Sequence, residues 1–280
     1  MRSFVILCFL LCAACGPTPT SPNSNSATSN ANANSKPQSG PVPVYTYEIV
    51  NTYPHDPKAF TQGLIFHDGF FYEGTGGSRR RGDDFYSSLR KVEVKTGKVL
   101  QKFDLAPEYF GEGITLLDGK LYQLTWQEQK AFVYDLNDFK LLQELSYSGE
   151  GWGLTTDGMQ LYMSDGTHVI RVVNPADFKT VRTIPVLDEK GQPIMRLNEL
   201  EWVKGEIWAN VWETGWIMRI DPASGKLLGR IDFNDLMRRE LDADEDADVL
   251  NGIAFDPATD KIYITGKKWR RLFEITVKPK

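Results

Sequence analysis

From about residue 44 onward, hydrophobic and polar residues alternate in short runs that are separated by Gly, Asp and Asn. Residues 120–124 and 206–211 are two such runs, and alternation places every second side chain on the same face of an extended strand. A helical period is present only over residues 234–241. Runs this short and this often interrupted predict an all-β fold, which is a sandwich, a barrel or a propeller.

An internal repeat distinguishes between these three folds. Five segments align, and their first residues lie 50, 40, 46 and 53 positions apart: 62–66, 112–116, 152–156, 198–202 and 251–255. A second strand with an aromatic residue follows each segment at Tyr72, Tyr122, Tyr162, Trp208 and Tyr263. Third and fourth strands complete the first four units. Four strands per unit at this period predict a five-bladed β-propeller over residues 44–280.

The ends of the repeat region predict how the ring closes. The fifth unit contains only three strands before the chain ends at Lys280. A strand-like run at residues 44–53 precedes the first unit and has no partner of its own. We expect this N-terminal strand to close the last blade, because the pairing removes open strand edges.

The first 43 residues differ in composition from the rest. Arg2, an apolar run at residues 4–11 and the pair Ala13 and Ala14 precede Cys15, as in a signal peptide with a bacterial lipobox. The run is too short to span a bilayer, so residues 1–15 predict a signal peptide and a lipid on Cys15. Residues 16–43 are rich in Pro, Ser and Asn and predict a disordered linker. The expected location is the periplasmic side or surface of a bacterial cell envelope, and the alternative is secretion.

Charge and cysteine content exclude several classes of protein. The net charge of −5 is spread along the chain without a basic stripe, so nucleic acid is not an expected partner. All three cysteines lie within the first 15 residues, and the three histidines are scattered. We therefore expect no disulfide and no zinc cofactor in the domain, while the sequence does not decide whether a structural calcium ion binds.

The acidic run at residues 242–248 lacks the Gly and Glu of an EF-hand and predicts an exposed insertion. The expected oligomeric state is a monomer.

Equivalent positions of successive blades meet around the central channel of a propeller. The first strands begin with Gln62, Glu112, Trp152, Asn198 and Asn251, and the second strands end with Gly76, Trp126, Gly166, Trp212 and Lys267. A purely structural repeat would carry similar residues at these places. The actual set mixes amides, a carboxylate, an amine and three indoles, which predicts a binding or catalytic site at one mouth of the channel.

Five sequence blocks resemble one family in order along the domain. They are FTQGL at residues 60–64, FGEG at 110–113, LNELE at 197–201, NVW at 210–212 and TGKKW at 265–269. These blocks resemble the plant and bacterial glutaminyl-peptide cyclotransferases, which are five-bladed propellers unrelated to the zinc-dependent animal enzymes. The resemblance implies conversion of N-terminal glutaminyl residues of peptides to pyroglutamyl residues with release of ammonia. It places the pocket on Phe60, Gln62, Phe110, Glu112, Trp126, Trp152, Asn198, Trp212 and Lys267. One departure is Arg270, which stands where the family has proline.

The implied reaction assigns a role to each residue type. Glu112 is the one carboxylate among the channel positions and is the expected proton shuttle. Lys267, together with Asn198 or Gln62, is expected to donate hydrogen bonds to the oxyanion. Three tryptophans and two phenylalanines are expected to grip the substrate and exclude water: Trp126, Trp152, Trp212, Phe60 and Phe110.

Two other functions remain open from the sequence. A calcium-dependent propeller hydrolase of the lactonase type would need carboxylates or amides around a cation, which Asn198, Asn251 and Glu112 partly supply. A non-catalytic propeller that binds peptides or glycans would not need the proton transfer that we assign to Glu112.

Overall fold

The computed structural model describes residues 40–77, 82 and 86–280, and this part of the chain contains 20 strands and one short helix. The predicted signal peptide, the lipobox Cys15 and linker residues 16–39 lie outside the described residues. No helix in the described ranges is long and apolar enough to cross a membrane. The fold is therefore all-β, as the alternation of residues predicted.

Three sheets contain four consecutive strands each, arranged as antiparallel meanders. The first contains β2 (Thr61–His67), β3 (Phe70–Thr75), β4 (Ser88–Glu93) and β5 (Val99–Asp104). The second contains β6 (Gly111–Leu117), β7 (Lys120–Thr125), β8 (Lys130–Asp135) and β9 (Leu141–Ser146). The third contains β10 (Leu154–Thr156), β11 (Leu161–Met163), β12 (Val169–Val173) and β13 (Thr180–Pro185).

The fourth sheet has eight strands in the order β14-β15-β16-β17-β1-β20-β19-β18. Its members are β14 (Leu197–Val203), β15 (Glu206–Val211), β16 (Trp216–Ile220), β17 (Leu227–Asp232), β1 (Val44–Pro54), β20 (Arg271–Pro279), β19 (Lys261–Gly266) and β18 (Leu250–Asp256). Helix α1 (Asn234–Ala243) joins β17 to β18 and contains the stretch in which the sequence showed a helical period.

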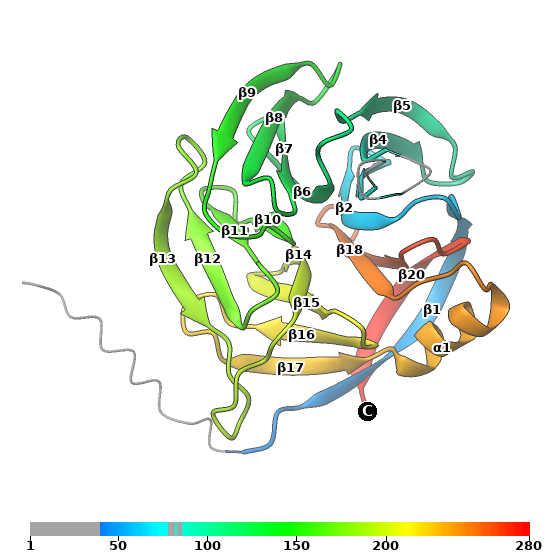
Figure 1. The fold of residues 1–280 in the computed structure, drawn as a ribbon. Coiled ribbons are helices and arrows are strands. Elements are labelled where there is room, and N and C mark those ends of the chain that lie inside the picture. The colour runs from blue at the N-terminus through cyan, green and yellow to red at the C-terminus, as the bar shows by residue number, and fades with distance from the viewer. Residues whose placement is uncertain (1–39, 78–81, 83–85) are drawn as a thin grey trace, which may run out of the picture. The chain divides into compact units, whose positions relative to one another are not determined.

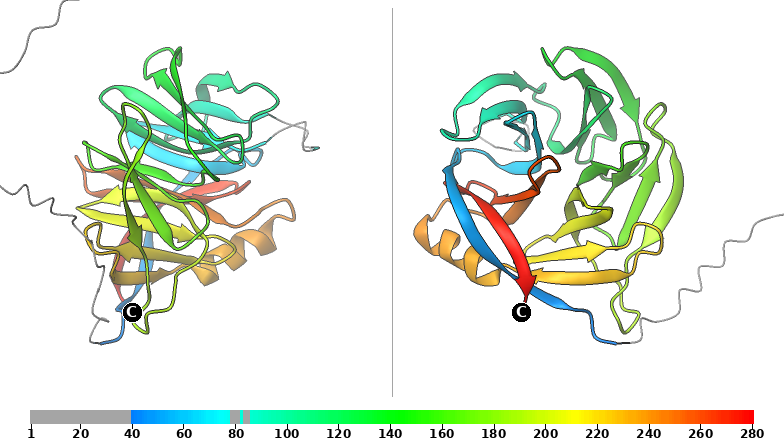
Figure 2. Two further views of the ribbon diagram at one scale, coloured as in Figure 1. Left: turned by 60° about the vertical axis from the view of Figure 1, so that its left-hand side comes forward. Right: turned by 180° about the vertical axis from the view of Figure 1, so that it is seen from behind.

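Strand β1 connects the two ends of the domain. It pairs antiparallel with the C-terminal strand β20 from Tyr45 to Pro54, and Figure 2 shows the two strands side by side. The sequence did not predict that Val44 and Tyr45 also pair in parallel with β17. The chain packs against the sheets from slightly before β1, since Val42 is buried in the core. β1 therefore joins four strands on one side and three on the other into a continuous sheet.

The sheets surround a central axis in a propeller-like arrangement. The first strand of each consecutive group contacts the next, in the order β2, β6, β10, β14 and β18, and β18 contacts β2 again. Figure 1 shows these strands near the centre, while β5, β9 and β13 lie at the periphery. The inner strands carry mostly buried residues, whereas the outer strands are largely exposed. The residues nearest the axis thus come from five separate parts of the sequence.

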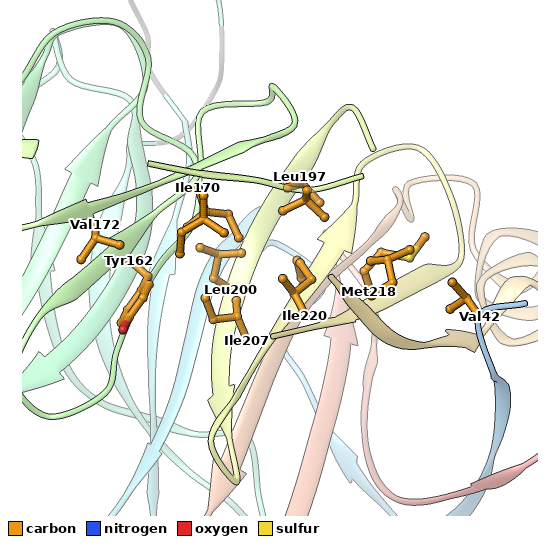
Figure 3. Close-up of a cluster of buried hydrophobic side chains, with 13 residues drawn as sticks. Val42, Tyr162, Ile170, Val172, Leu197, Leu200, Ile207, Met218 and Ile220 are labelled. Carbon is orange, nitrogen blue, oxygen red and sulfur yellow. The ribbon is translucent and has the colours of Figure 1, made fainter. Parts of the chain in front are cut away.

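Apolar side chains fill the spaces between neighbouring sheets. The described residues contain five apolar clusters, four of them between neighbouring sheets and one within the eight-stranded sheet, between β14–β17 and β18–β20. Figure 3 shows the cluster between the sheet of β10–β13 and strands β14–β16. Ile170 and Val172 of β12 meet Leu200 of β14 and Ile207 of β15 there, and all four are fully buried. Truncating one of these aliphatic side chains to Ala typically costs about 2–5 kcal/mol of stability. This packing holds the inner strands at fixed positions.

β-Bulges interrupt four inner strands at the channel positions. The register shifts between Thr61 and Gly63 in β2, and corresponding shifts occur in β6, β14 and β18. A bulge adds an unpaired residue and redirects its side chain. Gly113 follows Glu112 at such a bulge, and a Cβ atom there would lie 2.6 Å from the carbonyl oxygen of Trp152. Glycine is required because the next inner strand passes directly beside it.

Candidate active site

One cavity of about 360 Å³ brings the predicted site residues together. It is lined by Phe60, Gln62, Phe110, Glu112, Trp126, Trp152, Asn198, Trp212, Glu213, Asp248, Val249 and Lys267. All nine side chains predicted for the enzyme's pocket are in this set. The volume is within the range of sites for small ligands, and aromatic side chains dominate the lining. The predicted lipid-bearing Cys15 is outside the described residues.

Buried amides hold the carboxylate of Glu112. The Nε2 of Gln62 donates a hydrogen bond to Glu112 Oε1 over 3.1 Å, and Asn251 Nδ2 donates to Gln62 Oε1 over 3.3 Å. Glu112 is only 5% exposed and Gln62 only 4%. Asn251 does not line the cavity. Its Nδ2 also donates a hydrogen bond to the carbonyl of Thr61. The chain of amides therefore fixes the direction in which the Glu112 carboxylate points.

Lys267 contributes a buried amine. Its side chain is 4% exposed, and its Nζ lies 4.6 Å from the centre of the Phe60 ring. Burial lowers the pKa of Lys267 from its usual 10.5, while the negative charges of Glu112 and Asp248 oppose this shift. The loop between β19 and β20 carries Lys267, and a hydrogen bond from the Lys267 amide to the Val249 carbonyl holds it in place. Lys267 is thus a donor that can also exchange protons more readily than a surface lysine.

Asn198 presents an acceptor without a partner among the described residues. Its Oδ1 is buried and makes no hydrogen bond, although the residue is only 3% exposed. Leaving a buried polar atom unpaired costs about 1–3 kcal/mol. Because Asn198 lines the cavity, a ligand N–H group can supply the missing donor. Asn198 thus gives the cavity wall a buried polar atom whose hydrogen bonding is unsatisfied within the described residues.

Two arcs of aromatic rings form most of the cavity wall. Phe60 meets Phe110 edge to face with 6.2 Å between centroids, and Phe110 meets Trp126 in the same way at 5.7 Å. On the other side, Trp152 and Trp212 form a T-shaped pair at 5.5 Å. These geometries are the favourable ones for aromatic pairs. The wall is apolar and shaped by several strands that the propeller-like arrangement brings together.

Three acidic residues near the pocket escaped the sequence analysis. Glu150 accepts hydrogen bonds from the indole nitrogens of Trp126 and Trp152, over 2.7 and 2.9 Å. Asp248 and Glu213 line the cavity itself. Glu112 is therefore not the only carboxylate at the cavity, but it is the buried one, since the Glu213 side chain is 48% exposed. The sequence pattern that could have indicated Glu150 is Gly-Glu-Gly at residues 149–151, which repeats the Gly-Glu-Gly around Glu112 and places Glu150 two positions before Trp152.

The acidic run at residues 242–248 is mostly an exposed insertion, as expected, except at its end. Asp248 is half-buried at the cavity, and its carbonyl accepts a hydrogen bond from the Trp269 indole over 2.7 Å. Arg270 pairs with Asp244 of the same run. This ion pair joins the insertion to the loop that carries Lys267.

A buried ionic network lies behind the Lys267 loop. His55 Nδ1 bonds the carbonyl of Trp269 over 2.7 Å, and its Nε2 bonds Glu73 over 2.9 Å. Both partners are acceptors, so both ring nitrogens donate and His55 is an imidazolium. Burial acts to lower the pKa of His55, but the Glu73 carboxylate outweighs it and raises that pKa above 6.5. Burial acts to raise the pKa of Glu73, but Arg90 and His55 hold it below 4.5.

Strand β14 buries two further carboxyl groups, from Glu199 and Glu201. Glu199 accepts backbone hydrogen bonds from Leu64 and Ile253. Burial raises the pKa of both groups, and that of Glu201 reaches about 8. Within residues 40–77, 82 and 86–280, no three His, Cys, Asp or Glu side chains are grouped so as to hold a metal ion.

Comparison with known proteins identifies the family. The sequence model of the glutamine cyclotransferase family matches residues 23–277. A glutaminyl-peptide cyclotransferase of Arabidopsis thaliana is 41% identical over 236 residues, which are 82% of this chain and 71% of the plant protein. The crystal structure of Myxococcus xanthus glutaminyl cyclase matches with a TM-score of 0.76 and 36% identity, over 86% of this chain and 100% of that one. The family match and the cavity together lead to one conclusion: this chain belongs to the glutamine cyclotransferase family.

Proposed function

We propose that the cavity converts the N-terminal glutaminyl residue of a peptide into a pyroglutamyl residue and releases ammonia. The observation that carries this assignment is the convergence of a buried carboxylate, a buried amine and an unpaired amide oxygen inside an aromatic pocket. A glutaminyl head group has an amine, an amide and an apolar stem, and each has a counterpart in the wall. This combination fits cyclisation better than the lactonase or the non-catalytic alternative.

The reaction needs one proton to move between two nitrogens. The α-amine of the substrate attacks its own side-chain amide carbon, a C–N bond forms, and the bond to the amide nitrogen breaks. Glu112 takes the proton from the attacking nitrogen and delivers it to the leaving nitrogen, which departs as ammonia. Gln62 orients the Glu112 carboxylate through the 3.1 Å hydrogen bond and therefore acts as a positioning residue.

Negative charge develops on the amide oxygen during attack. Lys267 is the donor that we assign to this oxyanion, because its amine is buried beside the Phe60 ring and lines the cavity. A well-placed donor of this kind is commonly worth about 3 kcal/mol in the transition state. The unpaired Oδ1 of Asn198 accepts from the substrate amine, and this contact holds the amine for attack.

The aromatic wall favours a folded substrate. Because both reacting groups belong to one residue, enclosing the head group in a near-attack conformation supplies much of the rate acceleration. Trp126, Trp152 and Trp212 restrict the head group and keep water away from the reacting carbon. The cavity holds no Cys or His side chain, and the proposed mechanism uses no metal or other cofactor.

We also propose that the domain is a five-bladed propeller, with the eight-stranded sheet counted as two blades. Two observations support this count in the described residues: five core clusters separate successive four-stranded groups, and five inner strands contact one another in a closed circle. β1 is then the outer strand of the last blade, because its pairing with β20 is much longer than its contact with β17.

The N-terminal sequence supports a place in the bacterial cell envelope. In this proposal a lipid on Cys15 anchors the enzyme, and the Pro/Ser/Asn-rich residues between Cys15 and the buried Val42 let the catalytic domain reach peptides near the membrane. We further propose that the enzyme acts as a monomer.

Steady-state kinetics of two variants test the assigned roles. Lys267→Met should lower kcat by about 100-fold or more with little change in KM, because it removes a donor used in the transition state. Asn198→Ala should raise KM in addition to lowering kcat, since it removes a contact that is already made with the bound substrate. A Lys268→Met variant is the control, because Lys268 does not line the cavity. Equal losses in the Lys267 and Lys268 variants would contradict the assignment.

A further inference from the structure

Glu150 links the two aromatic arcs of the pocket. Its Oε2 accepts hydrogen bonds from both Trp126 Nε1 and Trp152 Nε1, and its Oε1 accepts one from Gln127 Nε2 over 3.0 Å. Trp126 ends the arc that starts at Phe60, and Trp152 begins the arc that continues to Trp212. One carboxylate oxygen thus accepts a hydrogen bond from each of the two arcs.

The carboxylate lies behind the wall and not inside the cavity. Glu150 is half-buried and is not among the residues that line the pocket. Its position is fixed by Arg171, which donates hydrogen bonds to the carbonyls of Ser148 and Glu150 over 2.7 and 2.8 Å. The Gly151 amide also bonds the carbonyl of Trp126 over 2.9 Å. The turn that presents Glu150 is therefore rigid relative to both indoles.

In this geometry the Nε1–H groups of Trp126 and Trp152, which are the only polar groups of their rings, both donate to Glu150. An indole has a single donor, and charge-assisted hydrogen bonds of 2.7–2.9 Å are strong. With both N–H groups directed at Glu150, the rings offer carbon surfaces to the substrate and no donor to its amide oxygen. Polar contact with the head group is then left to other lining residues, among them Lys267, Asn198 and Glu112.

From this arrangement we propose that Glu150 is a positioning residue, which fixes the orientation of Trp126 and Trp152 and thereby sets the affinity for the glutaminyl head group. The proposal rests on the cyclisation function assigned to the same pocket. Because Glu150 acts through the indoles and touches no reacting atom, its loss should weaken substrate binding more than it slows the chemical step.

The test compares Glu150→Gln with a matched control, Glu144→Gln. Glu144 lies on the exposed strand β9 and forms an ion pair with Lys130 at 3.7 Å. In Glu150→Gln, the amide keeps the size of the side chain but cannot accept from both indoles and Gln127 at once. We expect KM for a Gln-initiated dipeptide to rise by about tenfold and kcat to change by less than about threefold. The control should match the wild type.

Nuclear magnetic resonance of the indole N–H groups provides a readout independent of activity. The Nε1–H signals of Trp126 and Trp152 should both move upfield in Glu150→Gln and stay in place in Glu144→Gln, because a carboxylate acceptor deshields the proton. The double variant with Trp126→Phe gives a second test: coupling through a shared hydrogen bond makes the effects on KM non-additive.

Three results would overturn the proposal. They are unchanged indole signals, a KM within twofold of the wild type, or fully additive effects with Trp126→Phe. These failures differ from a failure of the cyclisation function, in which the wild-type protein itself would release no ammonia from the dipeptide.

Discussion

Replacing Glu112 with Gln separates proton transfer from every other role of this side chain. The variant keeps the volume of a side chain that is only 5% exposed, and its amide oxygen can still accept the hydrogen bond from Gln62. What it loses is the ability to take up a proton from the attacking amine. We therefore expect the protein to fold normally and to bind substrate while failing in the chemical step.

The expected loss of kcat follows from the typical contribution of a general acid–base residue. A general acid–base residue is typically worth about 10²–10⁴-fold in rate. A loss of ~100-fold corresponds to ~2.7 kcal/mol of transition-state stabilisation. We expect kcat to fall by at least ~100-fold and KM to change by less than about twofold, since the aromatic wall that grips the substrate is untouched.

The assay is continuous detection of ammonia from a Gln-initiated dipeptide, with kcat expressed per folded molecule after a thermal melt. The competing explanation is that Glu112 only braces the bulge between Gly111 and Gly113. In that case the variant would melt at a lower temperature and retain most of its turnover. A near-wild-type kcat in well-folded protein refutes the proton-shuttle role.

Four further outcomes follow from the sequence and the structure. Trp126→Ala should raise KM more than it lowers kcat, and the reverse pattern would place the indole in the chemical step. Activity should survive exhaustive treatment with EDTA or phenanthroline, and a loss that zinc or calcium reverses would contradict the metal-free mechanism. Cys15→Ala should abolish lipid attachment and release the domain from the membrane fraction, whereas unchanged membrane association would contradict the lipobox assignment. The melting temperature should be highest near pH 4.5 and should decline toward pH 8. Below pH 4.5 the unfolded chain takes up a proton at Glu73 that the folded protein, with its lowered Glu73 pKa, does not bind. Above pH 4.5 the unfolded chain ionises Glu201 while the folded protein keeps that buried carboxyl protonated up to about pH 8, and above pH 6.5 the unfolded chain also loses the proton that folded His55 retains. A melting temperature that rises steadily up to pH 8 would contradict these pKa directions, and Glu201→Gln should flatten the decline above pH 4.5.

The repeat made much of the architecture predictable. Each inner strand begins with a channel residue, and four of the five follow it directly with glycine because the next inner strand crowds that position. Seven of the ten aligned positions line the cavity, whereas Asn251, Gly76 and Gly166 do not, and Phe60 and Phe110 were predicted from the family resemblance and not from the repeat. The pairing of β1 with β20 was likewise predictable, since the N-terminal strand had no partner and the last unit lacked a fourth strand.

Contacts between side chains of different repeats were not predictable in the same way. Glu150 is functionally placed only because two indoles from different strands turn their N–H groups toward it, and periodicity does not carry that information. The parallel contact of β1 with β17 depends on the path of the chain between Val42 and Tyr45. Asp248 belongs to a run that looks uniformly exposed, and only the fold of the Lys267 loop brings its last residue to the cavity.

The central claim is that this cavity cyclises an N-terminal glutaminyl residue by attack of its own amine. The most direct measurement incubates the purified protein with a Gln-initiated dipeptide and, in parallel, with the same dipeptide acetylated on its α-amine. The account predicts one ammonia per pyroglutamyl product from the free peptide and none from the acetylated one, whose nitrogen can no longer attack. Release of ammonia from both peptides would indicate hydrolysis of the amide by water, and release from neither, above the rate without enzyme, would contradict the assigned function.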